Sequence, residues 1–454
     1  MSLIIPANTL ASGGYEVDNS LRFNDGSSDF LSKTFSSAGN QQKMTISFWI
    51  KRSDLSGTKE VISQGSGSAC HMNFPSSGIL EMNLRNSVDG GSNVLLVTNR
   101  LFRDVSAWYH IVLALDTTQG TAANRAKLYV NGVQETSFGT ENYPSQNGNL
   151  FFNEASAMQI GEDTGGANFN YDGYMAEFVF INAEQLAPTS FGEFDEDSGI
   201  FKPIDVSGLT FGTNGFFLEF QDSGALGADV SGNGNNFTVN NLTAVDQSTD
   251  TCTNNFAVGN PLVQNDLPAF SNGNLTYTSG SNNYKTGLST IGVSSGKWFM
   301  EVLFVSGSTA IIGVVDEADF SSLNGNTAGA GFTTNSVGYY KDGTKWIADS
   351  ESSYGASYTA NDTIGIALDL DSGTKTVTFY KDGASQGAIN LPTTGTGTFF
   401  FAPGAYNSVL SANYGSPPYA ISSGNTDANG YGNFEFTVPS GYYALNTKNL
   451  AEFG

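Results

Sequence analysis

The stretch Thr45-Ile46-Ser47-Phe48-Trp49-Ile50 decides the fold class, because its side chains alternate with a period of two. Ile46, Phe48 and Ile50 share one side of this segment, since successive side chains of a strand point to opposite faces. The same period recurs along the chain, and no window of a dozen residues gives the apolar stripe of an amphipathic helix. The sequence therefore predicts an all-β protein.

Each half of the chain contains a strand pair of this kind. Residues 108–115 alternate, residues 126–130 alternate again, and Asn131-Gly132 follows, which is the strongest short signal for a β-hairpin turn. In the C-terminal half, residues 364–370 alternate and lead into the turn Asp371-Ser372-Gly373. The two halves are therefore expected to fold by the same scheme.

The length and composition fit two large domains. Of the 454 residues, 39% are hydrophobic and 12% aromatic, which is enough apolar area for folded cores. Between the two halves, prolines and polar residues replace the alternation, which is typical of a linker. The predicted parts are an N-terminal arm at 1–18, a first sandwich at 19–242, a linker at 243–272, a second sandwich at 273–416 and a C-terminal arm at 417–454. Both arms are candidates for packing against other chains.

The charge and the cysteines exclude several classes of protein. A formal net charge of −24 repels phosphate backbones, so we expect no nucleic acid partner. Cys70 and Cys252 cannot form a disulfide scaffold, and the chain has no Cys/His spacing typical of zinc sites. Leu3-Ile4-Ile5 runs directly into Pro6 without a preceding basic residue, unlike a secretory signal, and no run approaches 18 apolar residues. We expect synthesis in a cytoplasm and no membrane insertion.

Short motifs of the N-terminal half come in a family-like order. They are Ser20-Leu21-Arg22-Phe23-Asn24, the stretch 45–50, Trp108-Tyr109-His110, Leu128-Tyr129-Val130-Asn131-Gly132, Gln159-Ile160-Gly161 and Tyr171-Asp172-Gly173. This order resembles the laminin-G and concanavalin A-like lectin group over about residues 18–200. The segments 217–220 and 229–235 resemble the strand pair that opens such domains, and here they come last. We expect them to complete the same sandwich, up to about residue 242.

The C-terminal half contains a second ordered set of motifs. They are Gly296-Lys297-Trp298-Phe299-Met300-Glu301-Val302, Ile312-Gly313-Val314, Gly338-Tyr339-Tyr340, the stretch 362–369, Val377-Thr378-Phe379-Tyr380-Lys381-Asp382-Gly383 and Asn413-Tyr414-Gly415. This half resembles a SPRY domain, itself a concanavalin A-like sandwich. The two resemblances imply two concanavalin A-like antiparallel β sandwiches, or jelly rolls, in tandem.

The combination of both halves carries a third resemblance. Together with the opening Met-Ser-Leu-Ile-Ile-Pro-Ala-Asn, the acidic stretch 191–197 and the ending 443–450, it is similar to virion proteins of marine tailed bacteriophages. This resemblance implies a location on the virion surface after synthesis in a host cytoplasm and release by lysis. It implies other virion proteins as partners, and a homo-oligomer.

Two motifs superficially suggest hydrolysis. Glu193, Asp195 and Glu196 resemble the paired carboxylates of laminarinases, but the final Glu of that pattern is missing, which favours a solvated acidic loop. Gly292-Val293-Ser294-Ser295-Gly296 matches a nucleophile elbow, but a strand is expected after it instead of a helix, and the chain has only His71 and His110. We therefore expect no enzyme activity and no catalytic residues.

One loop has the spacing of a calcium site. Asp229, Ser231 and Asn233 place oxygen side chains at positions 1, 3 and 5, with a glycine at position 6. The twelfth position is Asn240 instead of a bidentate Glu, so the loop is either a weak calcium site or a turn rich in Asp and Asn. No other cofactor is expected.

The candidate ligand-binding residues lie in predicted loops. Tyr340, Asp342, Trp346 and Tyr354 cluster where a SPRY-like sandwich presents loops, and aromatic faces beside polar groups suit sugar or peptide contact. In the lectin-like half, Asn131 and Asp163 are the second choice. A purely structural role of these residues remains open.

Two functions remain open from the sequence. The first is an adhesin of the tail fibre or spike type, whose loops bind a polysaccharide of the host surface. The second is a capsid or tail decoration protein that only fills and bridges the particle. Long fibres normally show coiled-coil or β-helical repeats, and the chain has none, so a compact subunit is expected in either case.

Overall fold

The computed structural model describes residues 14–65, 69–88, 94–166, 169–263, 267–323 and 329–454. It is nearly all β, with 41% strand and 6% helix, as the alternation predicts. The described residues up to Thr253 form one compact unit, the N-terminal unit, and those from Asn254 form a second, the C-terminal unit. None of the described helices is both long enough and apolar enough to cross a membrane.

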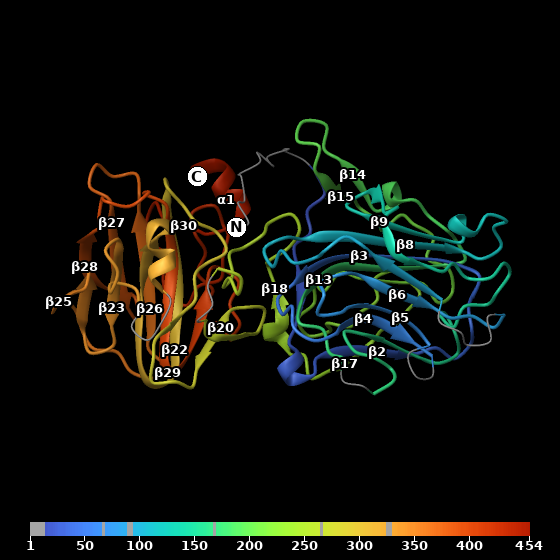
Figure 1. The fold of residues 1–454 in the computed structure, drawn as a ribbon, viewed down its shortest axis with the longest axis horizontal. Helices are drawn as coiled ribbons and strands as arrows, with labels where there is room; N and C mark the ends of the chain where they lie inside the picture. Colours follow the sequence, from blue (N-terminus) through green and yellow to red (C-terminus); the bar gives the residue numbers. More distant parts are fainter. Residues whose placement is uncertain (1–13, 66–68, 89–93, 167–168, 264–266, 324–328) are drawn as a thin grey trace. The chain divides into compact units, whose positions relative to one another are not determined.

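The N-terminal unit is a sandwich of two antiparallel sheets (Figure 1). The first sheet has the order β10 (Val133–Gln134), β9 (Ala126–Val130), β8 (Tyr109–Asp116), β3 (Lys43–Arg52), β13 (Gly173–Asn182), β1 (Ser20–Phe23) and β18 (Gln247–Ser248), with β16 (Phe216–Leu218) also on β13. The second has the order β11 (Phe138–Glu141), β7 (Leu95–Thr98), β6 (Glu81–Leu84), β5 (Cys70–Phe74), β4 (Lys59–Gln64), β12 (Ala157–Ile160), β2 (Phe30–Thr34) and β17 (Thr238–Asn240).

The core of this unit lies between its two sheets. Ile46, Phe48 and Ile50 of β3 all point into it, as their alternation predicts, and they meet Met72 and Met82 of the second sheet in one buried cluster. Of the expected late strand pair, only the first segment is a strand: β16 joins the first sheet, residues 229–235 form a turn and not a strand, and the next strand, β17, joins the edge of the second sheet. A separate hairpin, β14 (Gly192–Phe194) with β15 (Phe201–Pro203), packs Phe201 against Trp49 on the outer face of the first sheet.

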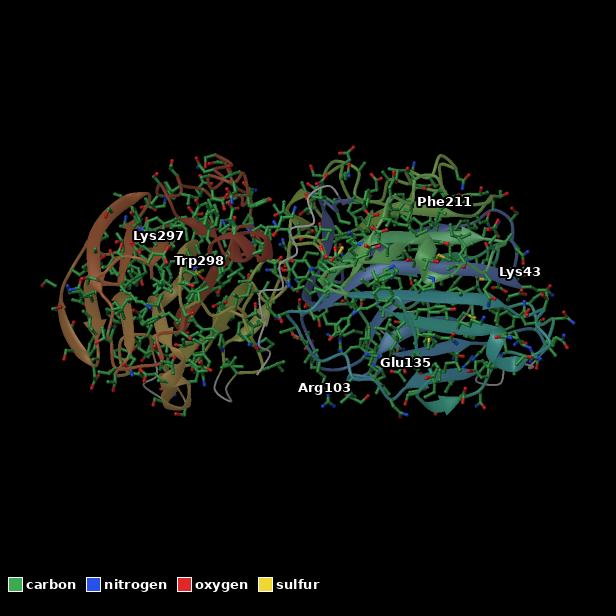
Figure 2. All side chains as sticks on the ribbon, turned by 90° about the horizontal axis from the view of Figure 1, so that it is seen from above. Lys43, Arg103, Glu135, Phe211, Lys297 and Trp298 are labelled. Atoms are coloured by element: carbon green, nitrogen blue, oxygen red, sulfur yellow. The ribbon has the colours of Figure 1, made fainter. Side chains whose placement is uncertain are left out.

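The C-terminal unit is built around two long strands, β22 (Lys297–Asp316) and β29 (Phe399–Asn413), which pair with each other over most of their length. The first part of β22 also pairs with β26 and its last part with β23, so both layers of the sandwich share this strand. The remaining strands are β19 (Ala269–Ser271), β20 (Thr276–Ser279), β21 (Lys285–Thr286), β23 (Ser336–Tyr340), β24 (Thr344–Ile347), β25 (Ser350–Ser353), β26 (Thr363–Asp369), β27 (Thr376–Lys381), β28 (Ala384–Asn390) and β30 (Tyr443–Ala444). Trp298 of β22, labelled in Figure 2, is fully buried in the core of this unit.

The helices are few and short. Five 3-10 turns connect strands: η1 (Asp25–Ser27), η2 (Ala122–Asn124), η3 (Pro188–Ser190), η4 (Ala244–Asp246) and η5 (Glu317–Leu323). The single described α-helix, α1 (Thr447–Phe453), follows β30, and the Asn446 side chain caps it by accepting the N–H of Asn449.

The expected linker at 243–272 is divided between the two units. Its first part belongs to the N-terminal unit, because β18 pairs with β1 and the buried Asp250 forms an ion pair with Lys51. The distance from Lys51 Nζ to Asp250 Oδ2 is 2.7 Å. Its later part belongs to the C-terminal unit, where Ala257 donates its N–H to the Leu445 carbonyl. The boundary between units therefore falls at residues 253 and 254, not over a stretch of thirty residues.

The described parts of the two expected arms pack within the units themselves. Residues 1–13 lie outside the described residues, but Val17 is buried and donates its N–H to Thr253 Oγ1. In the C-terminal segment, β30 pairs with β22, and Leu445 and Leu450 enter the core. These apolar side chains are therefore not available for another chain, because packing within the unit already buries them.

Candidate functional site

The predicted ligand residues of the lectin-like half have structural partners. Asn131 has a positive φ of 47° in the turn after β9, and its Oδ1 accepts the backbone N–H of His110 at 2.7 Å. Asp163 is only 4% exposed, and its Oδ1 accepts the N–H of Phe169 at 3.3 Å. Asn131 therefore fixes a hairpin, whereas Asp163 orders a loop that lies beside a polar sheet face described below.

The predicted ligand residues of the SPRY-like half divide between two sides of one sheet. Trp346 of β24 stands opposite Gly338 of β23, so it shares the outer face with Tyr340. There the rings form a cluster with Tyr284, Phe332 and Tyr406; for example, the Trp346 ring lies 4.7 Å from that of Phe332. Both Tyr340 and Trp346 are half-buried.

Tyr354 and Asp342 are held in place by their own unit. The Tyr354 ring packs at 5.3 Å against the buried ring of Tyr339, and its hydroxyl donates to the Gly387 carbonyl. Asp342 is exposed, and its Oδ1 accepts both the N–H and the Oγ1 hydroxyl of Thr344. The structure thus brings Tyr340 and Trp346 together but separates Tyr354 from them, because side chains alternate between the faces of a strand.

The calcium-like loop is organised by hydrogen bonds of its own. Asp229 Oδ1 accepts the N–H groups of Phe217 and Ser231, and its Oδ2 accepts that of Asn235 at 2.7 Å. The Ser231 hydroxyl accepts the N–H of Asn233, whose side chain donates to the Gly212 carbonyl. Among the described residues, no three His, Cys, Asp or Glu side chains are placed to hold a metal ion. This geometry favours the turn interpretation of the loop.

The acidic stretch forms the hairpin of β14 and β15. Glu193 and Glu196 are exposed, and Lys202 lies 3.5 Å from Glu193 and 3.3 Å from Asp195. Hydrogen bonds from the backbone and side chain of Ser198, together with Lys202, lower the pKa of Asp195 to about 2. These carboxyls therefore stand on a solvated turn, as the sequence predicts.

A small cavity lies beneath this hairpin. Ser47, His110 and Glu177 contribute its polar lining, and Trp49 and Phe191 contribute apolar walls. His110 Nε2 lies 2.9 Å from Ser47 Oγ, and burial lowers the pKa of His110 to about 3, so its ring is neutral. Burial also raises the pKa of Glu177 to about 8, with a smaller contribution from the charges of Glu219, Asp205 and Asp18.

The outer face of the second sheet carries polar side chains on β4, β5 and β6, the three strands that Figure 1 labels side by side. The inward positions of these strands are apolar and belong to the core, and the outward positions are polar. In register across neighbouring strands, His71 stands opposite Asn83, and Asn73 stands opposite both Glu60 and Glu81. We call these five residues the polar face.

Several buried oxygens of the polar face lack a hydrogen-bond donor. Glu60, Asn73 and Asn83 are 1%, 6% and 4% exposed, and Glu60 Oε1, Asn73 Oδ1 and Asn83 Oδ1 have no partner. Burial, with the negative charges of Asp163 and Glu81, raises the pKa of Glu60 well above its ordinary value. A buried polar atom without a partner is destabilising by roughly 1–3 kcal/mol, and the raised pKa holds Glu60 in its protonated form, in which the carboxyl can donate a hydrogen bond as well as accept one.

Sequence reasoning missed the polar face, although a signal for it exists. In the segments 70–74 and 81–84, polar residues occupy alternate positions between apolar ones. That alternation shows which side chains point away from the core, but it does not show that neighbouring strands place them in one row. The pairing of strands far apart in sequence decides this, and only the structure gives it.

Comparisons with known proteins agree with both resemblances. Residues 24–187 match the concanavalin A-like lectin/glucanases superfamily, and residues 297–417 match the SPRY domain family. No curated protein matches the chain. None of these findings indicates a phage or marine origin.

Solved structures show likeness at low identity. A human SPRY domain is 20% identical, covering 33% of this chain and 94% of its own, with a TM-score of 0.26. The SPRY domain of human HERC1 is 19% identical, covering 34% and 96%, with a TM-score of 0.26. A native heptameric SAP-like pentraxin from Limulus polyphemus is 17% identical, covering 38% and 78%, with a TM-score of 0.29. The family matches therefore carry the assignment: this chain contains a concanavalin A-like domain followed by a SPRY domain.

Proposed function

We propose that this protein is a non-enzymatic adhesin on a virion surface, of the tail fibre or spike type, that binds glycans of the host surface. The observation that carries the proposal is the presence of a concanavalin A-like segment and a SPRY segment on one chain. Lectin-like and SPRY domains suggest a binding role, and the chain contains both.

The non-enzymatic part of the proposal is supported by the acidic hairpin. Retaining hydrolysis of a glycan needs two carboxyls about 5–5.5 Å apart facing a sugar. Glu193 and Asp195 instead contact Lys202 on a solvated turn. Purified protein should release no reducing ends from laminarin or from host envelope polysaccharide, and release that disappears in Glu193→Gln would contradict this.

The experiment for adhesion combines binding and location. Purified protein should bind host cells, and an antibody against it should label the tails of intact virions. Because Tyr340 and Trp346 share an outer face, their joint replacement by alanine tests whether the SPRY domain contributes to adsorption. A folded double variant that adsorbs normally would remove the SPRY domain from the binding role, and protein that fails to bind cells would refute the adhesin.

A decoration role on the capsid or tail is the second candidate. It is favoured by the loop residues Asp342, Asn131 and Asp229, whose polar atoms are already used in hydrogen bonds of their own turns. Antibody label spread over the capsid, together with unchanged adsorption of virions lacking the protein, would support decoration over adhesion.

A further inference from the structure

The outer face of β22 is covered by a segment of the C-terminal arm, residues 422–438, which we call the strap. Because alternate side chains of β22, such as that of Trp298, point into the core, Phe299 and Glu301 point to the outer face. Both are buried there, with exposed fractions of 2% and 0%. Phe434 of the strap packs on Phe299, and the two ring centroids lie 5.2 Å apart. The strap therefore encloses a carboxyl group together with an apolar patch of the sheet.

Glu301 binds the strap through the backbone of the strap. Its Oε2 accepts the N–H of Glu435 at 2.9 Å, and its Oε1 accepts the N–H of Phe436 at 2.8 Å. From β29, Asn413 Nδ2 lies 3.3 Å from Glu301 Oε2 and also donates to the Asn433 carbonyl at 2.9 Å. One buried carboxyl thus joins two successive residues of the strap to the sheet.

The groups that face Glu301 include no base. On β26 its cross-strand neighbour is Gly365, and on β29 it is Asn413. The titratable groups beside it are Glu435 and Tyr419, both from the C-terminal arm. Burial, with a smaller contribution from the charge of Glu435, raises the pKa of Glu301 to about 7 from an ordinary value of 4.5. The enclosed carboxyl is therefore favoured in its protonated form.

The rest of the strap has few buried contacts. Residues 422–424 and 428–430 are exposed. A further contact with the unit is made by Asp427, whose Oδ2 accepts the N–H of Ala444 at 2.9 Å. Because much of the strap is exposed, it can open locally while the strands beneath it remain folded.

We propose that the strap is a pH-dependent cover, which stays closed in acid and opens more often as the solution approaches neutral pH. Opening brings Glu301 into water, where it ionises readily, so opening releases a proton. It also uncovers Phe299 and Ala367 of the sheet, which the closed strap buries. The device thus couples the exposure of an apolar sheet face to the acidity of the solution.

The direction of the effect follows from the two protonation equilibria of Glu301. Between pH 4.5 and 7 the closed state binds more protons than the open state. The stability of closure is therefore fully present below pH 4.5 and is lost as pH rises through 7, above which it stays constant. Over this interval the open population rises by up to about tenfold per pH unit.

The experiment measures amide hydrogen exchange of the full chain at pH 5, 6, 7 and 8, with rates corrected for the intrinsic pH dependence of exchange. A peptide that contains Glu435 and Phe436 should lose protection by up to about tenfold per pH unit up to pH 7 and then level off. The amides of β26 should remain far more protected at every pH, because the opening is local. Exchange of the strap that does not change with pH, or that occurs at the same rate as exchange of β26, would overturn the proposal.

Two variants identify the group responsible. Glu301→Gln cannot titrate, so its strap should exchange with no dependence on pH, whatever its level of protection. Glu351→Gln, at an exposed position of β25 in the same unit, is the matched control and should keep the original dependence. The same dependence in Glu301→Gln as in this control would refute the assignment to Glu301.

A third variant keeps the experiment decisive if Glu301→Gln does not fold. Glu435→Gln removes the neighbouring charge and leaves in place the backbone N–H that Glu301 accepts. The loss of protection should then level off at a lower pH than in the original protein. A profile in Glu435→Gln that equals the original one would in that case overturn the proposal.

Discussion

Single buried residues of the N-terminal unit set its response to acid and base. Glu177 is 7% exposed, has a positive φ of 49°, and lies at a register shift of β13, where a strand bulge re-aims its side chain. Its Oε2 accepts the hydroxyl hydrogen of Tyr15. A carboxyl in this position is favoured in its protonated form, because burial is unfavourable for the charge.

The first prediction follows from the pKa of Glu177, which is about 8 in the folded protein and 4.5 as an ordinary value. Between these two values the folded state binds more protons than the unfolded state. The contribution of Glu177 to the free energy of unfolding is therefore fully present below pH 4.5 and is lost as pH rises through 8. Between these pH values it falls by up to roughly 1.4 kcal/mol per pH unit. Urea unfolding from pH 5 to 9 should show a flatter decline in Glu177→Gln.

The exposed carboxyl of Glu184 offers the control for this series. Glu184→Gln should reproduce the slope of the original protein. A slope in Glu177→Gln that equals this control would contradict the assignment of the decline to Glu177.

The second prediction concerns calcium at Asp229. Because its carboxylate already accepts three backbone N–H groups, ion binding would have to displace hydrogen bonds that order the loop. We expect no change in melting temperature on adding millimolar calcium, and a loss of about 1–2 kcal/mol in Asp229→Ala, as for other capping residues. Calorimetric titration that gives micromolar affinity, absent in Asp229→Ala, would show that the loop is a metal site.

At the scale of elements, the short strand β18 closes the N-terminal unit. It covers only Gln247–Ser248, but Asp250, two residues further on, lies buried between Lys51 Nζ, at 2.7 Å, and Trp108 Nε1, at 3.1 Å. Ser20 Oγ donates to the Asp250 carbonyl at 2.6 Å. The end of this unit is thus held to strands near its beginning by a buried charge pair.

The third prediction tests this closure. Asp250→Ala removes a carboxylate partner from an ammonium group that is fully buried, so the free energy of unfolding should fall by about 3–5 kcal/mol. Glu193→Ala, which breaks a pair on the surface, should change it by less than about 1 kcal/mol. Limited proteolysis should also spare residues 244–259 in the original protein, and early cleavage there would argue against the closure.

The elements of this protein differ in how far the sequence could predict them. The strand at 45–50 was predictable because Ile46, Phe48 and Ile50 face the core and alternate with the smaller polar side chains of Thr45 and Ser47 on the opposite face. The role of residues 243–250 was not, because their polar composition is typical of a linker and their partners Lys51 and Ser20 lie some two hundred residues earlier. Likewise, the aromatic residues 339–358 read as one cluster in sequence, but Tyr339 and Tyr340 point to opposite faces of β23.

At the scale of the whole molecule, the net charge of −24 shapes how an adhesin of this composition would act. Long-range attraction to an anionic cell surface is absent, so binding depends on short-range hydrogen bonds and ring contacts. Such contacts are weak individually, and many copies on one particle raise the apparent affinity through effective concentration.

The fourth prediction is that adsorption depends little on salt and strongly on copy number. Screening shortens electrostatic interactions to about 10 Å at 0.1 M salt, but contacts between neutral groups act at closer range. Assembled particles should adsorb with nearly equal rates from 0.05 to 0.5 M sodium chloride, and isolated monomers should bind the same cells measurably but far more weakly. A rate that falls steeply with salt would indicate binding through basic patches instead.

The pairing of β22 with β29 has a consequence for mechanical load. Their hydrogen bonds run from Glu301 to Asp316 nearly without interruption, perpendicular to the strands. Tension applied along these strands loads all of the β22–β29 hydrogen bonds at the same time. A pull across the strands would instead break the bonds one after another. Because both layers of this unit share these strands, neither layer can be pulled away without breaking that row of hydrogen bonds.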